Sequence, residues 1–331
     1  MSDTRKSEFG MIEQPERGSL NEGLSFGYVD VPKVITPDER PFLDQLTANS
    51  LQLQKEIRPG HEIPMETRNV IIPTSYGDMN ARIYIPEGKK LRPLVMNYHG
   101  GGFVIRDIEC FDYLSRAYAK EGDAVVITIE YYLGPEYKYP VQAEQAYEAL
   151  LWARKHAAEF GADAVCDVLT GDSAGGNLSA VVTLMCRDRG EKLPAMIIPS
   201  YPVVDARPEV KRESDELYGT GYNLDYQHLL SYNRAYVEKT EQTSDPYVSP
   251  LLADLAGFPP TRMICAQCDV LLDSGMEFAE KLREAGVDID YRIYKGVPHD
   301  FLFYGFPESY AAYHQIGQWI RELTAGKEIN G

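Results

Sequence analysis

The chain reads VCDVLTGDSAG from residue 165 to residue 175. Residues 165–170 form a largely apolar run that predicts a buried strand, and residues 174–188 have the pattern of a helix. Between them, Gly171 to Gly175 match the form GxSxG, which places Ser173 on a sharp turn from strand to helix. Bulkier side chains at positions 171 and 175 would collide across this turn. The Ser173 hydroxyl is thereby exposed beside a helix N-terminus, whose dipole favours developing negative charge.

Ser173 is our candidate nucleophile. The alternative is an ordinary glycine-rich turn, but the strand before the motif and the helix after it are the context that a catalytic serine requires. Gly171 and Gly175 then support the turn by their lack of a side chain. We expect Asp172 to support the site without touching the substrate.

Strand and helix patterns alternate on both sides of this turn. Residues 70–73 and 81–86 predict an opening hairpin, and several of the later strands are nearly continuous apolar runs, as expected when both faces are buried. These later predicted strands are 92–98, 124–131, 165–170, 195–200, 262–267 and 290–295. The helical patterns between them are about 110–121, 141–160, 174–188, 273–285 and 308–323. The alternation predicts an α/β fold, with a mostly parallel, doubly wound sheet of about eight strands flanked by helices.

Two segments do not follow this alternation. Residues 1–60 contain a helix that is announced by Thr36-Pro37-Asp38-Glu39, which has the features of a capping box with proline in the first turn. Residues 205–245 form a polar and aromatic insertion between two strands, with a helical pattern near 224–237. An excursion of this length inside a compact domain is usually functional, for example as a lid.

The charge excludes several classes of function. The chain has 331 residues, with 33 Lys and Arg against 50 Asp and Glu, so its formal net charge is -17. This charge repels phosphate backbones and anionic membrane surfaces, so we expect neither a nucleic acid nor a membrane as partner. The acidic residues are spread along the chain, which is typical of a solubilising charge. Tyrosine is also abundant, with 23 Tyr against 11 Phe.

The start of the chain and its cysteines predict a cytoplasmic protein. Residues 1–6 read MSDTRK and are not followed by an apolar core, so we expect no secretory signal. No window has the roughly 18 apolar residues of a membrane span. The five cysteines are odd in number and scattered, which suits a reducing compartment. Cys265 and Cys268 match CxxC, but they end a predicted strand, where a reactive thiolate is not favoured.

A second glycine-rich stretch follows the predicted strand that ends at Tyr98. It reads His99-Gly100-Gly101-Gly102-Phe103. Consecutive glycines leave backbone amides unshielded and allow a substrate to approach closely. We assign an oxyanion hole to the amides of Gly101, Gly102 and Ala174, because a tetrahedral intermediate needs two or three such donors. A phosphate-binding loop is disfavoured, because no G-K-[ST] or GxGxxG follows, and a flexible turn is the remaining alternative. We expect His99 and Gly100 to shape the loop.

An attacking serine needs a base, and the base needs a carboxylate that orients it. Three histidines follow Ser173, namely His228 in the insertion, His314 inside a predicted helix and His299 in a loop after the last strand. Catalytic residues collect at such carboxyl ends of strands, so His299 is our candidate base. Asp269 lies two residues after a predicted strand and is our candidate acid.

Two other aspartates are alternatives to Asp269. Asp273 reads better as the N-cap of the helix that follows. Asp300 is next to His299, but an extended loop would point its side chain elsewhere.

Together these residues resemble the bacterial hormone-sensitive-lipase-like carboxylesterases of the α/β-hydrolase fold. The resemblance spans about residues 65–320 and is carried by these motifs: HGGG at 99–102, GDSAGGN at 171–177, SPL at 249–251 with Pro259-Pro260, DVLLD at 269–273, and His299 with Phe301. It implies an esterase that uses no cofactor or metal and acts on short- to medium-chain acyl esters. It also implies a helical cap over the core. The organisation we predict is 1–60 as N-terminal cap segment, 61–204 as the first part of the hydrolase core, 205–245 as cap insertion, and 246–331 as the second part of the core.

The chain departs from the family pattern at three positions. Tyr132 stands where the family usually has Arg, Phe103 replaces a frequent Trp, and Asp300 replaces the usual Gly after the catalytic histidine. The third change adds a carboxylate beside the base. It predicts that the acid limb of the pH–rate profile lies at higher pH.

The sequence therefore predicts a serine carboxylesterase for a small-molecule ester. The same core also fits a deacetylase of acetylated sugars or xenobiotics, or an amidase, and a non-catalytic ligand-binding protein is a further alternative. We expect Phe103, Tyr222 and Phe301 to line the substrate pocket. Five tyrosines of the insertion either contact substrate or pack the lid on its base: Tyr218, Tyr222, Tyr226, Tyr232 and Tyr236. The sequence leaves the oligomeric state open, with a homodimer as one candidate.

Overall fold

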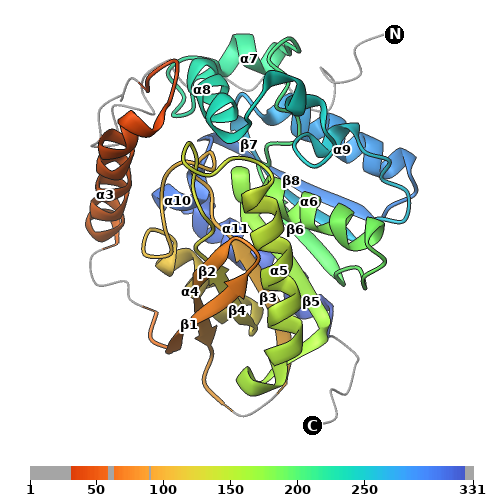
Figure 1. Cartoon of the computed structure of the whole chain (residues 1–331). Coiled ribbons are helices and arrows are strands. Elements are labelled where there is room, and N and C mark those ends of the chain that lie inside the picture. Colours follow the sequence, from red (N-terminus) through yellow and green to blue (C-terminus); the bar gives the residue numbers. More distant parts are fainter. Residues whose placement is uncertain (1–30, 59–62, 89–90, 325–331) are drawn as a thin grey trace.

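The computed structural model describes residues 31–58, 63–88 and 91–324. Their core is one eight-stranded sheet with the order β1-β2-β4-β3-β5-β6-β7-β8 (Figure 1). β1, β2 and β4 pair antiparallel, and every other neighbouring pair is parallel. The strands are β1 (Glu66–Thr74), β2 (Gly77–Ile85), β3 (Arg92–Tyr98), β4 (Val125–Ile129), β5 (Ala162–Asp172), β6 (Met196–Ser200), β7 (Thr261–Cys268) and β8 (Ile289–Pro298). The predicted α/β fold with a mostly parallel sheet is confirmed.

Helices cover both faces of this sheet. They are α4 (Asp112–Gly122), α5 (Val141–His156), α6 (Ala174–Asp188), α9 (Leu272–Glu284) and α11 (Pro307–Glu322). Successive strand residues point to opposite faces, so Val95 and Val168 pack in one cluster with side chains of α4 and α11. Their neighbours Met96 and Leu169 pack in a second cluster with side chains of α5, α6 and α9. Burial on both faces explains why β3, β4 and β6 are apolar almost throughout.

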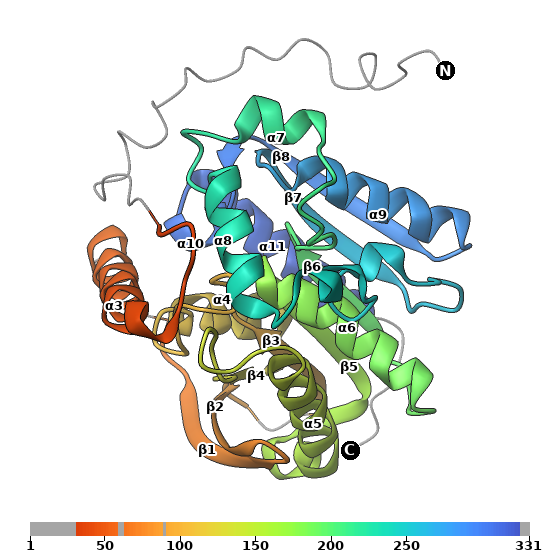
Figure 2. The ribbon, with the colours of Figure 1, turned by 45° about the horizontal axis from the view of Figure 1, so that its top comes forward.

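Additional helices lie outside this core pattern. They are α3 (Arg40–Ile57), α7 (Glu213–Tyr218), α8 (Tyr226–Tyr236) and the short α10 (Phe301–Tyr304). Figures 1 and 2 show α3 on one side of the molecule near α10, with α7 and α8 across the end that comes forward in Figure 2. Side chains of α3 and α8, among them Leu43 and Ala235, share a small apolar cluster with Val104 and Ile105. The segments 31–58 and 205–245 therefore meet over the loop that follows β3.

Local sequence signals explain where α3 begins. The Thr36 side chain accepts a hydrogen bond from the Asp38 amide, and the Glu39 carboxylate accepts one from the Thr36 amide at 2.7 Å. This capping box stabilises a short 3-10 turn, Pro37–Glu39, that leads directly into α3. The predicted helix start at Thr36 is confirmed.

Some element predictions need correction. The helix expected over 141–160 ends at His156 and continues as a 3-10 turn, Ala157–Phe160. The short helices α7 and α10 were not predicted. The N-cap assignment for Asp273 is wrong, because α9 already begins at Leu272. The Asp273 carboxylate instead accepts a hydrogen bond at 2.9 Å from the amide of Ser214 in α7.

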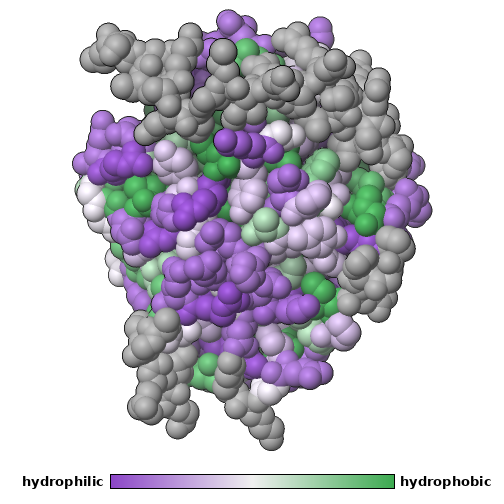
Figure 3. Space-filling model, turned by 180° about the vertical axis from the view of Figure 1, so that it is seen from behind, coloured by the Kyte–Doolittle hydropathy of each residue, from purple (hydrophilic) through white to green (hydrophobic). Residues whose placement is uncertain are grey.

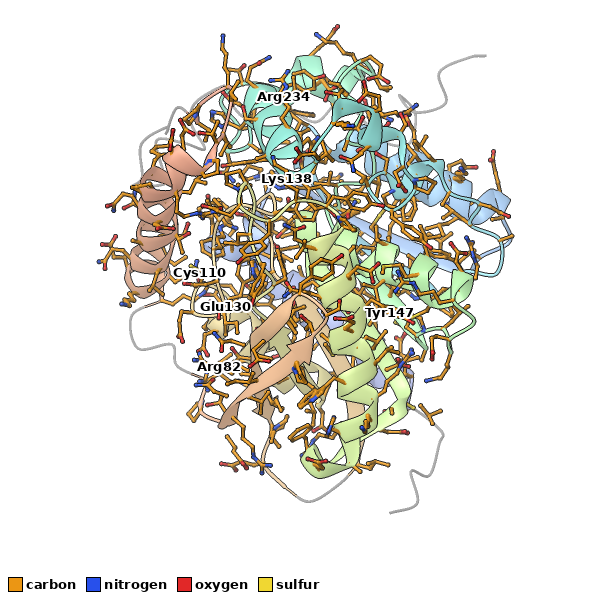
Figure 4. All side chains as sticks on the ribbon, in the orientation of Figure 1. Arg82, Cys110, Glu130, Lys138, Tyr147 and Arg234 are labelled. Atoms are coloured by element: carbon orange, nitrogen blue, oxygen red, sulfur yellow. The ribbon has the colours of Figure 1, made fainter. Side chains whose placement is uncertain are left out.

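The segment after β4 is fastened to the end of α8. Lys138 and Arg234, both labelled in Figure 4, lie near this junction, and Lys138 Nζ donates to the carbonyl oxygen of Ala235 at 2.8 Å.

The face opposite to that of Figure 1 is largely hydrophilic, with hydrophobic residues in small separate patches (Figure 3). In the part of the chain that the structure describes, no helix combines the length and apolar character needed to cross a membrane.

Candidate active site

Ser173 lies on the tight turn between β5 and α6. Its backbone has φ 54° and ψ -114°, a conformation that costs a non-glycine residue free energy and is found mainly at functional sites. The turn is held by the Ser173 amide, which donates to the carbonyl oxygen of Ser200 at 2.9 Å. A Cβ at Gly175 would overlap the carbonyl oxygen of Tyr98, so α6 begins in direct backbone contact with the end of β3. Only glycine permits this approach.

His299 and Asp269 meet Ser173 from the ends of two other strands. Asp269 directly follows β7, and His299 directly follows β8. His299 Nε2 lies 3.0 Å from Ser173 Oγ, and His299 Nδ1 lies 2.7 Å from Asp269 Oδ2. The other Asp269 oxygen accepts a hydrogen bond from the Leu271 amide at 2.9 Å, which fixes the carboxylate. All three side chains are buried. The structure therefore brings the three predicted residues together in the geometry of a serine nucleophile, its base and an orienting carboxylate.

The glycine loop after β3 lies beside Ser173. Gly101 has φ 117° and Gly102 has φ 60°, which only glycine adopts readily. A Cβ at Gly102 would lie 2.6 Å from the ring of Tyr232 in α8, so the loop also needs glycine for space. Among the described residues, none accepts a hydrogen bond from the amides of Gly101, Gly102 or Ala174. These three donors are available to a substrate oxygen.

His99 supports this loop from inside. Its Nδ1 donates to the carbonyl oxygen of Gly100 at 2.8 Å, and its ring stacks on Tyr131 with 4.2 Å between ring centres. The Tyr131 hydroxyl donates to the His99 carbonyl oxygen at 2.7 Å. Burial lowers the pKa of His99 to about 4, so the ring is neutral at neutral pH. This arrangement supports a role in shaping the loop.

The sequence suggested that Asp300 lies in an extended loop, and the structure shows that it does not. Its φ of 67° is in the left-handed region, and its Oδ2 accepts a hydrogen bond from Arg106 Nη2 at 2.5 Å. Arg106 itself packs over the ring of Phe303 at 4.1 Å. On the other side, Asp172 Oδ1 accepts a hydrogen bond from the Gly100 amide at 3.0 Å. The carboxylate next to His299 is thus paired with a buried cation.

A cavity of about 300 Å³ opens onto Ser173 and His299. Its apolar wall comes from the glycine loop and from the segments 31–58 and 205–245, and includes Leu46, Leu53, Phe103, Ile105, Leu224 and Leu229. Polar groups also line it, among them Asn49, Ser50, Arg106, Asn223, His228, Asn233, Asp300 and Tyr304. The wall is therefore a mixture of apolar and polar side chains.

The structure separates the three predicted lining residues. Phe103 lines the cavity and stacks on Tyr236 with 3.8 Å between ring centres. Tyr222 does not line it, because its ring packs edge-on against Tyr218 inside the 205–245 segment. Phe301 does not line it either, because it is buried between Tyr201 and Tyr294. For these two residues the expectation of substrate lining is wrong in this structure.

The other histidines and the tyrosines that the sequence singled out differ in whether they line the cavity. His228 lines the cavity and accepts a hydrogen bond from the Val31 amide at 3.3 Å, whereas His314 is exposed and contacts Glu121. Of the tyrosines in the insertion, Tyr232 lines the cavity. Within residues 31–58, 63–88 and 91–324, no group of three or more His, Cys, Asp and Glu is placed to hold a metal ion.

Sequence reasoning missed Asn223. This residue has a left-handed backbone, and its Nδ2 donates to the carbonyl oxygen of His299 at 3.0 Å. Its Oδ1 accepts a hydrogen bond from the Tyr304 hydroxyl at 2.8 Å. The only signal in the sequence was its type, because asparagine tolerates a left-handed backbone better than most residues. The 205–245 segment thus reaches the loop that carries His299.

Known proteins share both the sequence and this architecture. The model of a family described as having the alpha/beta hydrolase fold matches residues 95–303. The chain is 37% identical over 254 residues to "Carboxylic ester hydrolase LipN" of Mycobacterium tuberculosis (strain ATCC 25618 / H37Rv), covering 75% of this chain and 67% of that protein. It is 35% identical over 240 residues to "Arylesterase" of Saccharolobus solfataricus, covering 72% and 77%. A solved esterase of Pyrobaculum calidifontis superposes with a TM-score of 0.84 at 32% identity, covering 92% of this chain and 98% of that one.

The family model matches most of the chain, and the matched residues 95–303 include Ser173, Asp269 and His299. The chain belongs to the α/β-hydrolase family and, within it, to the hormone-sensitive-lipase-like carboxylic ester hydrolases.

Proposed function

We propose that this carboxylic ester hydrolase cleaves short- to medium-chain acyl esters through an acyl-enzyme on Ser173. His299 acts as general base and then as general acid, and Asp269 orients it. The observation that supports these roles is the hydrogen-bonded row of Ser173, His299 and Asp269, of which the first two line the cavity, beside three backbone amides that donate to no described residue.

The first step is acylation. His299 Nε2 takes the Ser173 proton as Oγ attacks the ester carbonyl carbon, and the negative charge that forms on the carbonyl oxygen is stabilised by the amides of Gly101, Gly102 and Ala174. Asp269 stabilises the imidazolium without taking its proton. The C–O bond to the alcohol then breaks, and the alcohol leaves with the proton from His299.

The second step is deacylation by water. His299 removes a proton from the water molecule that attacks the acyl carbon, and the same three amides hold the new oxyanion. Collapse of this intermediate releases the carboxylic acid and returns the proton to Ser173 Oγ. No external cofactor or metal is needed for either step.

The size of the cavity supports the chain-length proposal. Its volume of about 300 Å³ lies at the low end of the roughly 300–1,000 Å³ that small-molecule sites span. The apolar wall formed by Phe103, Leu46 and Leu229 suits an uncharged acyl or alkyl group. Acetyl esters belong to the proposed range, and the deacetylase and amidase activities remain alternatives on the same core.

The decisive experiment compares two serine variants on a panel of aryl acetate, butyrate and palmitate esters and one anilide. Ser173→Ala is expected to lower kcat by about 10⁴-fold or more, because the triad acts as a unit. Ser179→Ala is the matched control, since Ser179 is also buried and lies on α6 close to Ser173 in the chain, but donates only to the Gly175 carbonyl oxygen. Near-normal ester hydrolysis by Ser173→Ala would overturn the proposal, and a preference for the anilide would favour the amidase.

The cap, compartment and assembly form part of the same proposal. We infer that residues 1–60 and 205–245 act as the cap, supported by the cavity wall that 31–58 and 205–245 supply. A cytoplasmic location is supported by five buried cysteines, none of which forms a disulfide bond. A homodimer is supported by β8, an edge strand whose outer side pairs with no described strand. Sedimentation of the purified protein tests the dimer.

A further inference from the structure

A buried cluster of three charged side chains lies behind the catalytic residues. Asp172 precedes Ser173, Asp300 follows His299, and Arg106 comes from the loop after β3. Their exposed fractions are 1%, 4% and 8%, so bulk water solvates none of them well. The mechanism above uses none of the three. Two of them, Asp172 and Asp300, are direct neighbours of catalytic residues in the chain.

The hydrogen bonds of this cluster leave two oxygens without a donor. Asp172 Oδ1 is occupied by the Gly100 amide, and Asp300 Oδ2 is occupied by Arg106. Asp172 Oδ2 and Asp300 Oδ1 are buried, and no hydrogen-bond donor of the described residues reaches either of them. The Asp300 carboxyl is close enough to act on the Asp172 carboxyl both as a negative charge and as a hydrogen-bond partner, and both influences raise the pKa of Asp172. A contact between two carboxyl groups is a hydrogen bond only if one of them carries a proton.

The charges around Asp172 and Asp300 also favour a state in which the two carboxyl groups together carry one proton. Among the described residues, Arg106 is the only cation that hydrogen-bonds to either aspartate. Burial and the neighbouring Asp300 raise the pKa of Asp172 well above its ordinary value, and Arg106 opposes them only in part. His99 and five tyrosines that lie near the pair or Arg106 are uncharged at neutral pH: Tyr118, Tyr131, Tyr201, Tyr232 and Tyr304. One cation therefore balances one carboxylate, and the second carboxyl is neutral.

We propose that Asp172 and Asp300 share one proton between Oδ2 and Oδ1, with Arg106 as counter-ion, and that this bond positions the catalytic loops. The bond joins three pieces of chain: the glycine loop through the Gly100 amide, the turn that carries Ser173, and the loop that carries His299. Asp172, Asp300 and Arg106 are positioning residues. Their role in catalysis depends on the function proposed for Ser173 and His299, whereas the shared proton does not.

Infrared difference spectroscopy tests the proton directly, because a protonated carboxyl absorbs apart from a carboxylate. In Asp172→Asn the amide oxygen still accepts from Gly100 and the NH₂ group donates to Asp300. The spectrum of wild type minus Asp172→Asn at neutral pH is expected to contain a protonated-acid band. Asp205→Asn is the control, because Asp205 is also buried but is ionised beside Arg207 and Arg212, which lower its pKa. Its difference spectrum is expected to contain carboxylate bands only.

Kinetics with three variants test the positioning role. Asp172→Ala is expected to lower kcat by about ten- to a hundredfold, because it leaves buried partners unsatisfied. Asp172→Asn is expected to retain most of the wild-type kcat. Asp172→Leu fills the same space but makes no hydrogen bonds, so its kcat is expected to stay low.

Three results would overturn the proposal. They are a wild-type spectrum without any protonated carboxyl at neutral pH, a difference spectrum for Asp172→Asn that contains only carboxylate bands, or equal recovery by Asp172→Leu and Asp172→Asn. The first of these needs no variant to fold. An inert Ser173→Ala enzyme together with a missing acid band would refute this inference and leave the proposed function standing.

Discussion

Asp269 is the residue whose assignment had a close rival in the sequence. Asp269 contacts His299 Nδ1, while Asp273, four residues later, contacts the Ser214 amide instead. Asp269→Asn should lower kcat by about a thousandfold or more, because an amide no longer holds the imidazole in the correct tautomer. Asp273→Asn is the control and should keep kcat within a few-fold of wild type. Steady-state rates on an aryl butyrate measure both, and a large kcat loss in Asp273→Asn alone would reverse the assignment.

His99 makes stability depend on pH. Its pKa is about 4 in the folded protein against 6.5 as the ordinary value, so between these pH values the unfolded chain binds the extra proton. The free energy of unfolding should therefore rise with pH across this window, by about 3 kcal/mol in total from this one group. Urea unfolding of wild type and His99→Gln measures the difference. The variant should show a smaller rise, and the exposed control His314→Gln should not.

At the scale of elements, Arg40 fastens α3 to the core. Its guanidinium donates to the carbonyl oxygens of Val104 and Gly134 at 3.1 and 2.5 Å, and to Glu136 at 2.8 Å. Arg40→Gln should lower the free energy of unfolding by about 1–2 kcal/mol, because backbone acceptors lose a charged donor. KM should rise more than kcat falls, since α3 supplies part of the cavity wall. Arg68→Gln is the control and should change neither the free energy of unfolding nor KM, because Arg68 and its partner Glu66 are both exposed. An unchanged KM in Arg40→Gln would contradict the link.

Elements with strong local signals could be predicted from the sequence. The helix 174–188 was predicted with the bounds that α6 has, because the glycine turn fixes its start. The triad residues follow directly on strands, so the GxSxG motif together with the position of the strand ends was enough to find them. The helices α7 and α10 have only six and four residues, too few for a periodic pattern, and contacts with distant segments stabilise them.

The missed side-chain contacts join residues that are far apart in the chain. Arg106 and Asp300 are separated by 194 positions, and Asn223 and His299 by 76. Nothing near either residue encodes such a pair. The sequence did mark Asp300 as unusual after the catalytic histidine, and the structure supplies the reason for its tolerance, which is a buried arginine partner.

At the scale of the whole molecule, the net charge of -17 acts on charged substrates. Because like charges repel and salt screens the repulsion, kcat/KM for an anionic ester should be lower than for a matched neutral ester at low salt. The gap should narrow as ionic strength rises. Rates for the two esters across a salt series measure it, with a neutral ester pair of different size as control. If kcat/KM were nearly equal for the anionic and the neutral ester at low salt, the net charge of the protein would not influence turnover.

The source of the cavity wall has a consequence for the history of such enzymes. In the proposed mechanism, bond cleavage depends on residues that follow strand ends and on backbone amides of the glycine loop and of Ala174, whereas the cavity wall comes largely from 31–58 and 205–245. After a gene duplication, one copy can therefore change its ester specificity through substitutions at residues such as Leu46, Ser50 or Leu229, while the reaction that it catalyses stays the same. The residues that set substrate specificity and the residues that catalyse the reaction lie in different stretches of the same chain, and each set can vary at its own rate.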